Sequence, residues 1–147
     1  MKHNATLAVW LLFVTGAPMR FYGQDSRGTP ASTFKQPIEM KHLRGVIADP
    51  MWAVMVKQQV TLQAQHGKDF SDIKSVQTDE EGRFDFGEIR RGTYRIFTTR
   101  RNFCQVLIPV RLAKRGWAGL RVAVPVAASD TYAGYCSDNT RIEQLAK

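Results

Sequence analysis

The most regular alternation of hydrophobic and polar side chains lies in residues 59–65, QVTLQAQ. Val60, Leu62 and Ala64 fall on one face of an extended chain. The polar residues on the other face are Gln59, Thr61, Gln63 and Gln65. A period of two predicts a strand with one face buried and the other in solvent.

Shorter segments with the same character predict further strands. They are residues 40–49 (MKHLRGVIAD), 73–78 (IKSVQT), 83–86 (RFDF), 92–99 (GTYRIFTT), 103–112 (FCQVLIPVRL) and 120–126 (LRVAVPV). In the fourth of these, Tyr94, Ile96 and Thr98 share one face. Pro109 and Pro125 restrict the last two to sheet edges, bulges or strand ends, because proline donates no hydrogen bond to a neighbouring strand.

Helical spacing is weak in the same region. The one candidate is NTRIEQLA at residues 139–146, which Ser137 or Asn139 could cap. Many short strands separated by turn residues predict an all-β sandwich or barrel. We expect this domain over residues 39–127, after a flexible linker at 24–38 and before a C-terminal tail at 128–147.

The first residues have the pattern of a signal peptide. Lys2 precedes an apolar run over residues 5–14, which has the length of a signal-peptide core and is short for a membrane span. We expect residues 1–23 to be removed and the protein to be secreted or periplasmic, with no transmembrane helix after processing. An uncleaved anchor or a buried helix is the alternative.

Export changes the interpretation of the cysteines. The chain has two, Cys104 and Cys136. In an oxidising compartment they favour a disulfide, which would add about 3–4 kcal/mol by loop-closure entropy. The C-terminal tail would then fold back along the sheet edge near Cys104. The alternative is two buried thiols. Two cysteines without CxxC spacing do not predict a zinc or redox site, and no metal or cofactor is expected.

The net charge is +8, and it becomes +6 without residues 1–23, which hold Lys2, Arg20 and no acid. Most of the excess lies in Arg83, Arg90, Arg91, Arg95, Arg100, Arg101, Arg111, Lys114, Arg115 and Arg121. A basic face attracts polyanions. For an exported protein the partner would be an anionic polymer such as a glycan rather than nucleic acid. A solvated surface without a partner is the simpler interpretation.

The segment TDEEGRFDFGEIRRGTYRIF at residues 78–97 predicts a tight hairpin turn at Asp79–Gly82, with Gly82 at positive φ. Phe84 and Phe86 then share one strand face, and we expect both in the core with Tyr94. Three consecutive acids make a calcium loop a poor alternative, since their side chains cannot easily converge.

This segment resembles the signature of the carboxypeptidase regulatory-like domain, in the transthyretin-like (prealbumin-like) group. The matching positions are Thr78, Asp79, Gly82, Phe84, Phe86, Gly92, Tyr94 and Ile96. The resemblance implies a seven- or eight-stranded antiparallel Greek-key sandwich that serves as an accessory module. The family often has a Gly soon after the Asp of the first strand, whereas DPMWAVMV at residues 49–56 has none.

The sequence therefore predicts a non-enzymatic module that binds an unknown protein or glycan. Trp52 and Trp117 are the candidate ligand-binding residues, because such rings can stack on sugars; covering the end of the core is their alternative role. Two other functions stay open. One is a carbohydrate-binding module, and the other is a small enzyme with His42 or His66 in a polar pocket.

Overall fold

The computed structural model describes residues 34, 36–127 and 140–145, and these form nine strands and no helix. Residues 1–23, where a signal peptide is expected, lie outside the described residues, as does most of the expected linker. No helix in the described part of the chain is long and apolar enough to cross a membrane.

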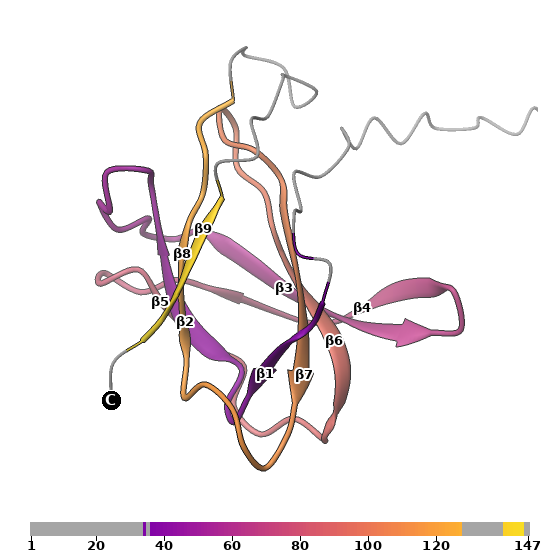
Figure 1. The fold of residues 1–147 in the computed structure, drawn as a ribbon. Helices are drawn as coiled ribbons and strands as arrows, with labels where there is room; N and C mark the ends of the chain where they lie inside the picture. Colours follow the sequence, from indigo (N-terminus) through magenta and orange to yellow (C-terminus); the bar gives the residue numbers. More distant parts are fainter. Residues whose placement is uncertain (1–33, 35, 128–139, 146–147) are drawn as a thin grey trace, which may run out of the picture.

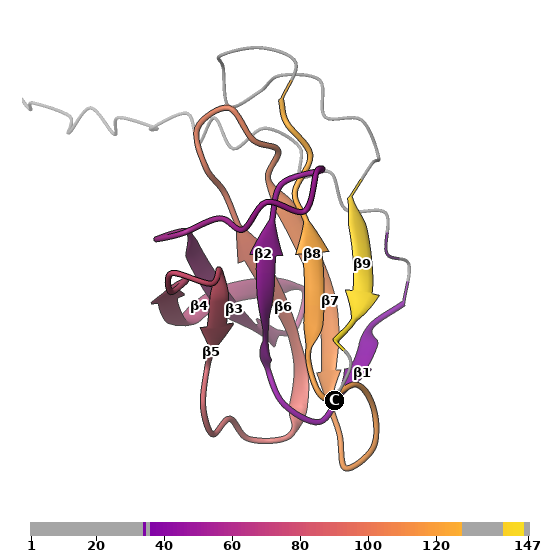
Figure 2. The same ribbon diagram turned by 90° about the vertical axis from the view of Figure 1, so that its left-hand side faces the viewer.

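The strands form two sheets that lie face to face (Figures 1 and 2). The five-stranded sheet has the order β1 (Ile38–Met40), β7 (Val106–Leu112), β6 (Gly92–Thr98), β3 (Gln59–His66) and β4 (Asp69–Gln77). The four-stranded sheet has the order β5 (Arg83–Asp85), β2 (Arg44–Ala48), β8 (Leu120–Ala123) and β9 (Arg141–Gln144). The all-β, two-sheet prediction is confirmed.

Both sheets are mixed, so the antiparallel prediction is wrong, and nine strands replace the expected seven or eight. The parallel pairs are β1 with β7 and β2 with β8. They arise because two of the crossings from the five-stranded to the four-stranded sheet, after β1 and after β7, run side by side in the same direction. The two crossings lie together: Lys41 N donates to Trp117 O at 2.7 Å, and Ala113 N donates to Met40 O at 2.9 Å.

The core lies between the sheets and includes the aromatic residues that the alternation predicted. Phe84, Phe86 and Tyr94 are buried within it, and Phe86 has no exposed surface. The rings of Phe84 and Phe86 meet edge to face, with centroids 5.6 Å apart. The predicted inward orientation of all three residues is confirmed.

Gly82 has φ +71°, as the turn prediction required, but the turn is not a hairpin. The strand before it, β4, belongs to the five-stranded sheet, whereas β5 after it pairs with β2 in the other sheet. The turn therefore carries the chain across the sandwich. Pattern alone could not separate these cases, because a hairpin and a crossing turn use the same residue types.

The C-terminal segment, whose residues 139–146 were the one helix candidate, forms a strand instead. Arg141–Gln144 is β9, antiparallel to β8, and Ile142 packs against the core. A helix of two turns is marginal on its own, whereas the edge of β8 offers backbone partners. The tail thus folds back along a sheet edge, as expected, but it does so as an added strand of the four-stranded sheet.

The polar face of β3 is only partly in solvent. Gln59 and Gln65 are exposed as predicted, whereas Thr61 and Gln63 are buried. Thr61 and Gln63 are 5% and 4% exposed. Thr61 shares a hydrogen bond with Ser75 at 2.9 Å, and Gln63 donates to Asp72 at 2.5 Å. Side chains of the neighbouring strands β4 and β6 therefore cover the middle of this face.

The prolines follow the expectation. Pro109 lies within β7, but β1 pairs only with Val110–Leu112, so β7 has no neighbour on that side at the proline. Pro125 follows the end of β8 at Ala123. In both places the missing N–H leaves no strand pairing incomplete.

Gly82 and Gly67 provide a matched test of the crossing turn. Both have positive φ, but a Cβ at Gly82 would lie 2.9 Å from Ile47 O, whereas one at Gly67 meets nothing within 4 Å. Gly67→Ala should lower the free energy of unfolding by about 1 kcal/mol through strain alone. Gly82→Ala should lower it by roughly 2–4 kcal/mol. Urea unfolding measures both, and equal losses would contradict the packed turn.

Phe86 should dominate the stability of the aromatic core. Phe86→Ala removes a fully buried ring and should cost roughly 3–5 kcal/mol of unfolding free energy. Phe97→Ala, on the half-buried outer side of β6, is the control and should cost less than about 2 kcal/mol. If thermal or urea unfolding showed similar losses for Phe86→Ala and Phe97→Ala, the assignment of the buried faces of β5 and β6 would be wrong.

Candidate functional site

The outer face of the four-stranded sheet is the surface that faces away from the core. Figure 2 looks onto it. Alternation places Gly45 and Ile47 inward, whereas the neighbouring positions of β2 point outward. Pairing in register then sets Arg83, Val46, Arg121 and Glu143 in one row across the four strands. This face combines charged and apolar groups, and no described strand covers it.

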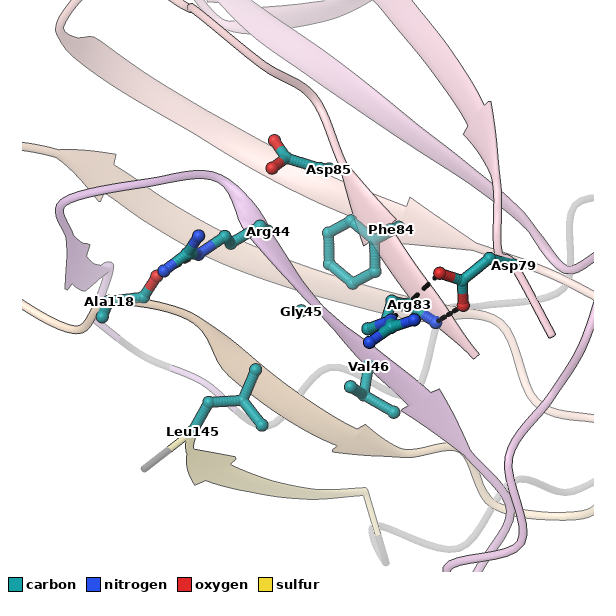
Figure 3. A pocket seen from close by; sticks show the side chains of 9 residues that line it. All are labelled: Arg44, Gly45, Val46, Asp79, Arg83, Phe84, Asp85, Ala118 and Leu145. Carbon is teal, nitrogen blue, oxygen red and sulfur yellow. Dashed lines mark hydrogen bonds and ion pairs between the residues drawn. The ribbon is translucent and has the colours of Figure 1, made fainter. Parts of the chain in front are cut away.

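A pocket of about 570 Å³ opens on this outer face. Its lining residues are Arg44, Gly45, Val46, Asp79, Arg83, Phe84, Asp85, Ala118 and Leu145. Figure 3 shows Arg83 joined to Asp79 on one side, with Leu145 from the chain after β9 on the other. The pocket therefore has an apolar floor and a charged rim, the usual character of a binding site.

Gly45 is required beneath the pocket. A Cβ there would lie 2.2 Å from Leu120 O and 2.9 Å from a ring carbon of Phe84. Only glycine lets β2 approach β8 this closely while the Phe84 ring lies against it. The shape of the pocket floor therefore depends on the absence of a side chain at Gly45.

The charged rim is ordered by the Asp79 carboxylate. It accepts hydrogen bonds from the backbone N–H of Arg83 at 2.8 Å and of Glu81 at 3.0 Å. Arg83 Nε donates to the second oxygen at 3.0 Å, and its Nη2 lies 2.6 Å from Glu81. The backbone hydrogen bond from Arg83 is the main cause that lowers the pKa of Asp79. The carboxylate is therefore charged at neutral pH and orients the arginine, while exposed pairs of this kind add little stability.

The loop that carries Trp52 has the same hydrogen bonds as the Asp79 turn. Asp49 Oδ1 accepts from Met51 N at 2.8 Å and from Ala53 N at 2.9 Å. Trp52 N donates to Asp49 O at 2.9 Å, just as Gly82 N donates to Asp79 O at 3.0 Å. Trp52 therefore occupies the position that glycine occupies in the second loop.

Trp52 accordingly has φ +66°, close to the +71° of Gly82. A bulky side chain in this conformation costs roughly 1–3 kcal/mol. The indole lies on the outer face, where Arg121 and Arg141 place their guanidinium carbons 4.4 Å and 5.0 Å from its ring centroid. Arg141 also donates to the backbone oxygen of Pro50. The predicted ligand residue Trp52 is thus part of an aromatic and cationic cluster.

Trp117 lies at the other end of the sheet. Its backbone bridges Met40, and its side chain is partly buried against the core. Trp52 follows the end of β2 and Trp117 precedes the start of β8, and these strands run parallel. The structure therefore does not bring the two predicted ligand residues together.

Arg121 and Arg141 were not singled out from the sequence as partners of Trp52. Pattern gives no reason to pair residues so far apart, and the segment that carries Arg141 was assigned to a C-terminal tail rather than to a strand. A signal was nevertheless present. Residues 49–53 (DPMWA) and 79–83 (DEEGR) both begin with Asp, and Trp52 has the same position after Asp49 as Gly82 has after Asp79.

A second hollow lies where the chain crosses between the sheets. His42, Lys41, Arg91 and Lys114 line an opening of about 250 Å³ beside Ile89. His66 is elsewhere, exposed at the end of β3 opposite Asp69. Within the described residues, no three His, Cys, Asp or Glu side chains are grouped to hold a metal ion.

The basic residues do not form one face. Arg83 and Arg121 lie on the outer face of the four-stranded sheet, whereas Arg95 and Arg111 belong to strands of the other sheet. Arg111 lies 3.9 Å from Glu39, and Arg95 stacks on Phe70 at 3.8 Å. The expected single basic surface is therefore divided over the molecule.

Cys104 is 1% exposed and lies just before β7. Its backbone N–H donates to Pro125 O at 2.8 Å. Cys136 lies outside the described residues, so its pairing with Cys104 stays a prediction.

Comparison with known proteins adds little. No protein-family model matches the chain, and no curated protein matches it. Among solved structures, the chain is similar to the crystal structure of (S)-allantoin synthase, with 11% identity and a TM-score of 0.45. The match covers 71% of this chain and 43% of that one, so the chain spans less than half of that protein. A likeness at this level carries no argument about activity.

Thiol titration tests the Cys104–Cys136 pair. The purified protein, denatured without reductant, should show no reactive thiol, because both cysteines would be in the disulfide. The same sample reduced and desalted should show two, which checks the assay. Two thiols before reduction would contradict the disulfide and weaken the case for an oxidising compartment.

Proposed function

We propose that the protein is a secreted or periplasmic, non-enzymatic binding module with a prealbumin-like Greek-key sandwich of the carboxypeptidase regulatory-like type. Its ligand, a protein or a glycan, binds across the outer face of the four-stranded sheet. The observation that carries the proposal is the pocket of about 570 Å³ on this face.

The composition of the pocket supports recognition of a ligand. Val46 and Leu145 offer apolar contact, and Arg44, Arg83 and Asp85 surround them with charges of both signs. Arg83 is held by two carboxylates and Arg44 Nε donates to Ala118 O at 3.0 Å, so both guanidinium groups are ordered before a ligand arrives. Ordered polar groups reduce the entropy lost on binding.

A small enzyme is the second candidate, and one observation favours it. His42 shares its hollow with Arg91 and two lysines, which is part of the polar pocket that an enzyme on a transthyretin-like scaffold would need. Histidine beside cationic groups could transfer protons at an anionic substrate. No serine lines this hollow.

Val46→Glu tests the binding function, because it places a charge on the apolar floor of the pocket. Arrays of glycans and of extracellular proteins would be probed with the wild-type protein and the variant. Ligands of the wild type should bind Val46→Glu at least about tenfold more weakly, since the carboxylate removes the apolar contact and can pair with the neighbouring Arg83 and Arg121 in place of a ligand.

Ile73→Glu, on the exposed edge strand β4 of the other sheet, is the matched control and should bind normally. Circular dichroism would show that both variants are folded. If a ligand binds Val46→Glu as tightly as the wild type but does not bind His42→Ala, its site is the hollow near His42 instead.

A further inference from the structure

Trp52 is held in a conformation that the fold does not require of a tryptophan. Its loop is closed by the carboxylate and backbone of Asp49, and no hydrogen bond of the loop uses the indole. The second loop makes the same bonds with Gly82 in the equivalent position. Glycine would therefore close the first loop as well, and without strain. A strained side chain that the fold can spare points to a role in recognition.

The indole also does not complete the core. Trp52 is partly exposed and is not among the residues that form or pack against the hydrophobic cluster. Its contacts are instead the guanidinium groups of Arg121 and Arg141, both on the outer face. The ring thus orders two cations on the surface.

Among the residues that the structure describes, these two cations have no carboxylate partner. Within the described part of the chain neither Arg121 nor Arg141 forms an ion pair. Glu143 is directly opposite Arg121 in register, yet no ion pair joins them. The two guanidinium carbons lie 4.4 Å and 5.0 Å from the same ring centroid, so two positive charges gather at one indole and attract an anion. A carboxylate is the anion that guanidinium groups bind with paired hydrogen bonds.

The surrounding face restricts the kind of ligand. Asp79, Glu81 and Asp85 lie around its other end, so a densely charged polymer such as a nucleic acid would be repelled there. The backbones of β2 and β8 are paired on both sides, so a peptide backbone would find few free groups. A sugar chain binds through side chains and can carry a single carboxylate among neutral units.

We propose that Trp52, Arg121 and Arg141 form a binding site for an acidic oligosaccharide, whose carboxylate binds to these guanidinium groups. This inference rests on the proposed binding function and names its ligand class. The neutral part of the sugar chain extends from Trp52 along the outer face toward the pocket at Val46.

The test uses an array of oligosaccharides that carry one uronate or sialate group, each beside its neutral counterpart. The wild type should bind acidic members at least about tenfold more tightly than neutral ones, because the paired hydrogen bonds need the carboxylate. Trp52→Gly should keep or raise the melting temperature, since strain is relieved, and should lose this binding. Arg121→Gln should weaken it at least about fivefold while leaving the loop intact.

Two controls separate the site from general effects. Lys57→Gly also relieves a positive φ, of +53°, without touching the cluster, and should bind like the wild type. Arg111→Gln removes one positive charge from the other sheet and should change binding less than about twofold. Equal loss in Arg111→Gln and Arg121→Gln would reduce the effect to net charge and overturn the site.

The inference and the proposed function fail differently. If no acidic member binds better than its neutral counterpart, or if Trp52→Gly binds normally, the acidic-sugar site is wrong. Protein or neutral ligands that are still lost with Val46→Glu would then leave the binding function in place. Insensitivity of every ligand to Val46→Glu would remove the proposed function as well.

Discussion

The sandwich depends on satisfying the backbone where the chain crosses between its two sheets. Two crossings, after β2 and after β4, meet at the buried Thr78. Its backbone exchanges hydrogen bonds with Gln58 and Lys57, and its hydroxyl donates to Met55 O at 2.5 Å while accepting from Gln58 N at 2.8 Å. The Gln58 side chain is 3% exposed, and its amide nitrogen donates a hydrogen bond to the Thr98 hydroxyl at 2.6 Å. Without such partners these buried groups would each cost about 1–3 kcal/mol.

The same crossings carry the candidate site. Each contains a loop closed by an aspartate, one at Asp49 and the other at Asp79, and both loops lie beside the four-stranded sheet. Ile47 N donates to Gly82 O at 2.9 Å, which ties the second loop to β2. The charged rim of the pocket and the Trp52 cluster are therefore held by the backbone that closes the fold. The candidate site and the stability of the fold therefore depend on the same part of the molecule.

The sequence predicted what depends on local pattern. Alternation placed Phe84, Phe86 and Tyr94 in the core, and Gly82 showed positive φ, because strand faces and turn conformations are decided by a few neighbouring residues. Pairing between distant segments was missed. The parallel pairs and the strand β9 depend on which edges remain open after the other strands pair, and this is a property of the whole fold. Trp52 was found as an aromatic residue, whereas its arginine partners come from strands remote in sequence.

The equivalence of the two aspartate loops has a consequence for mutation. The tryptophan codon differs from one glycine codon in a single base, so one substitution can exchange Trp52 for the residue that the Asp79 loop carries. Most surface positions have no single substitution that removes a functional group and relieves strain together. At this position glycine is therefore an accessible replacement that the backbone favours. Persistence of an aromatic residue in descendants of this chain would be a record of selection acting on the ring itself.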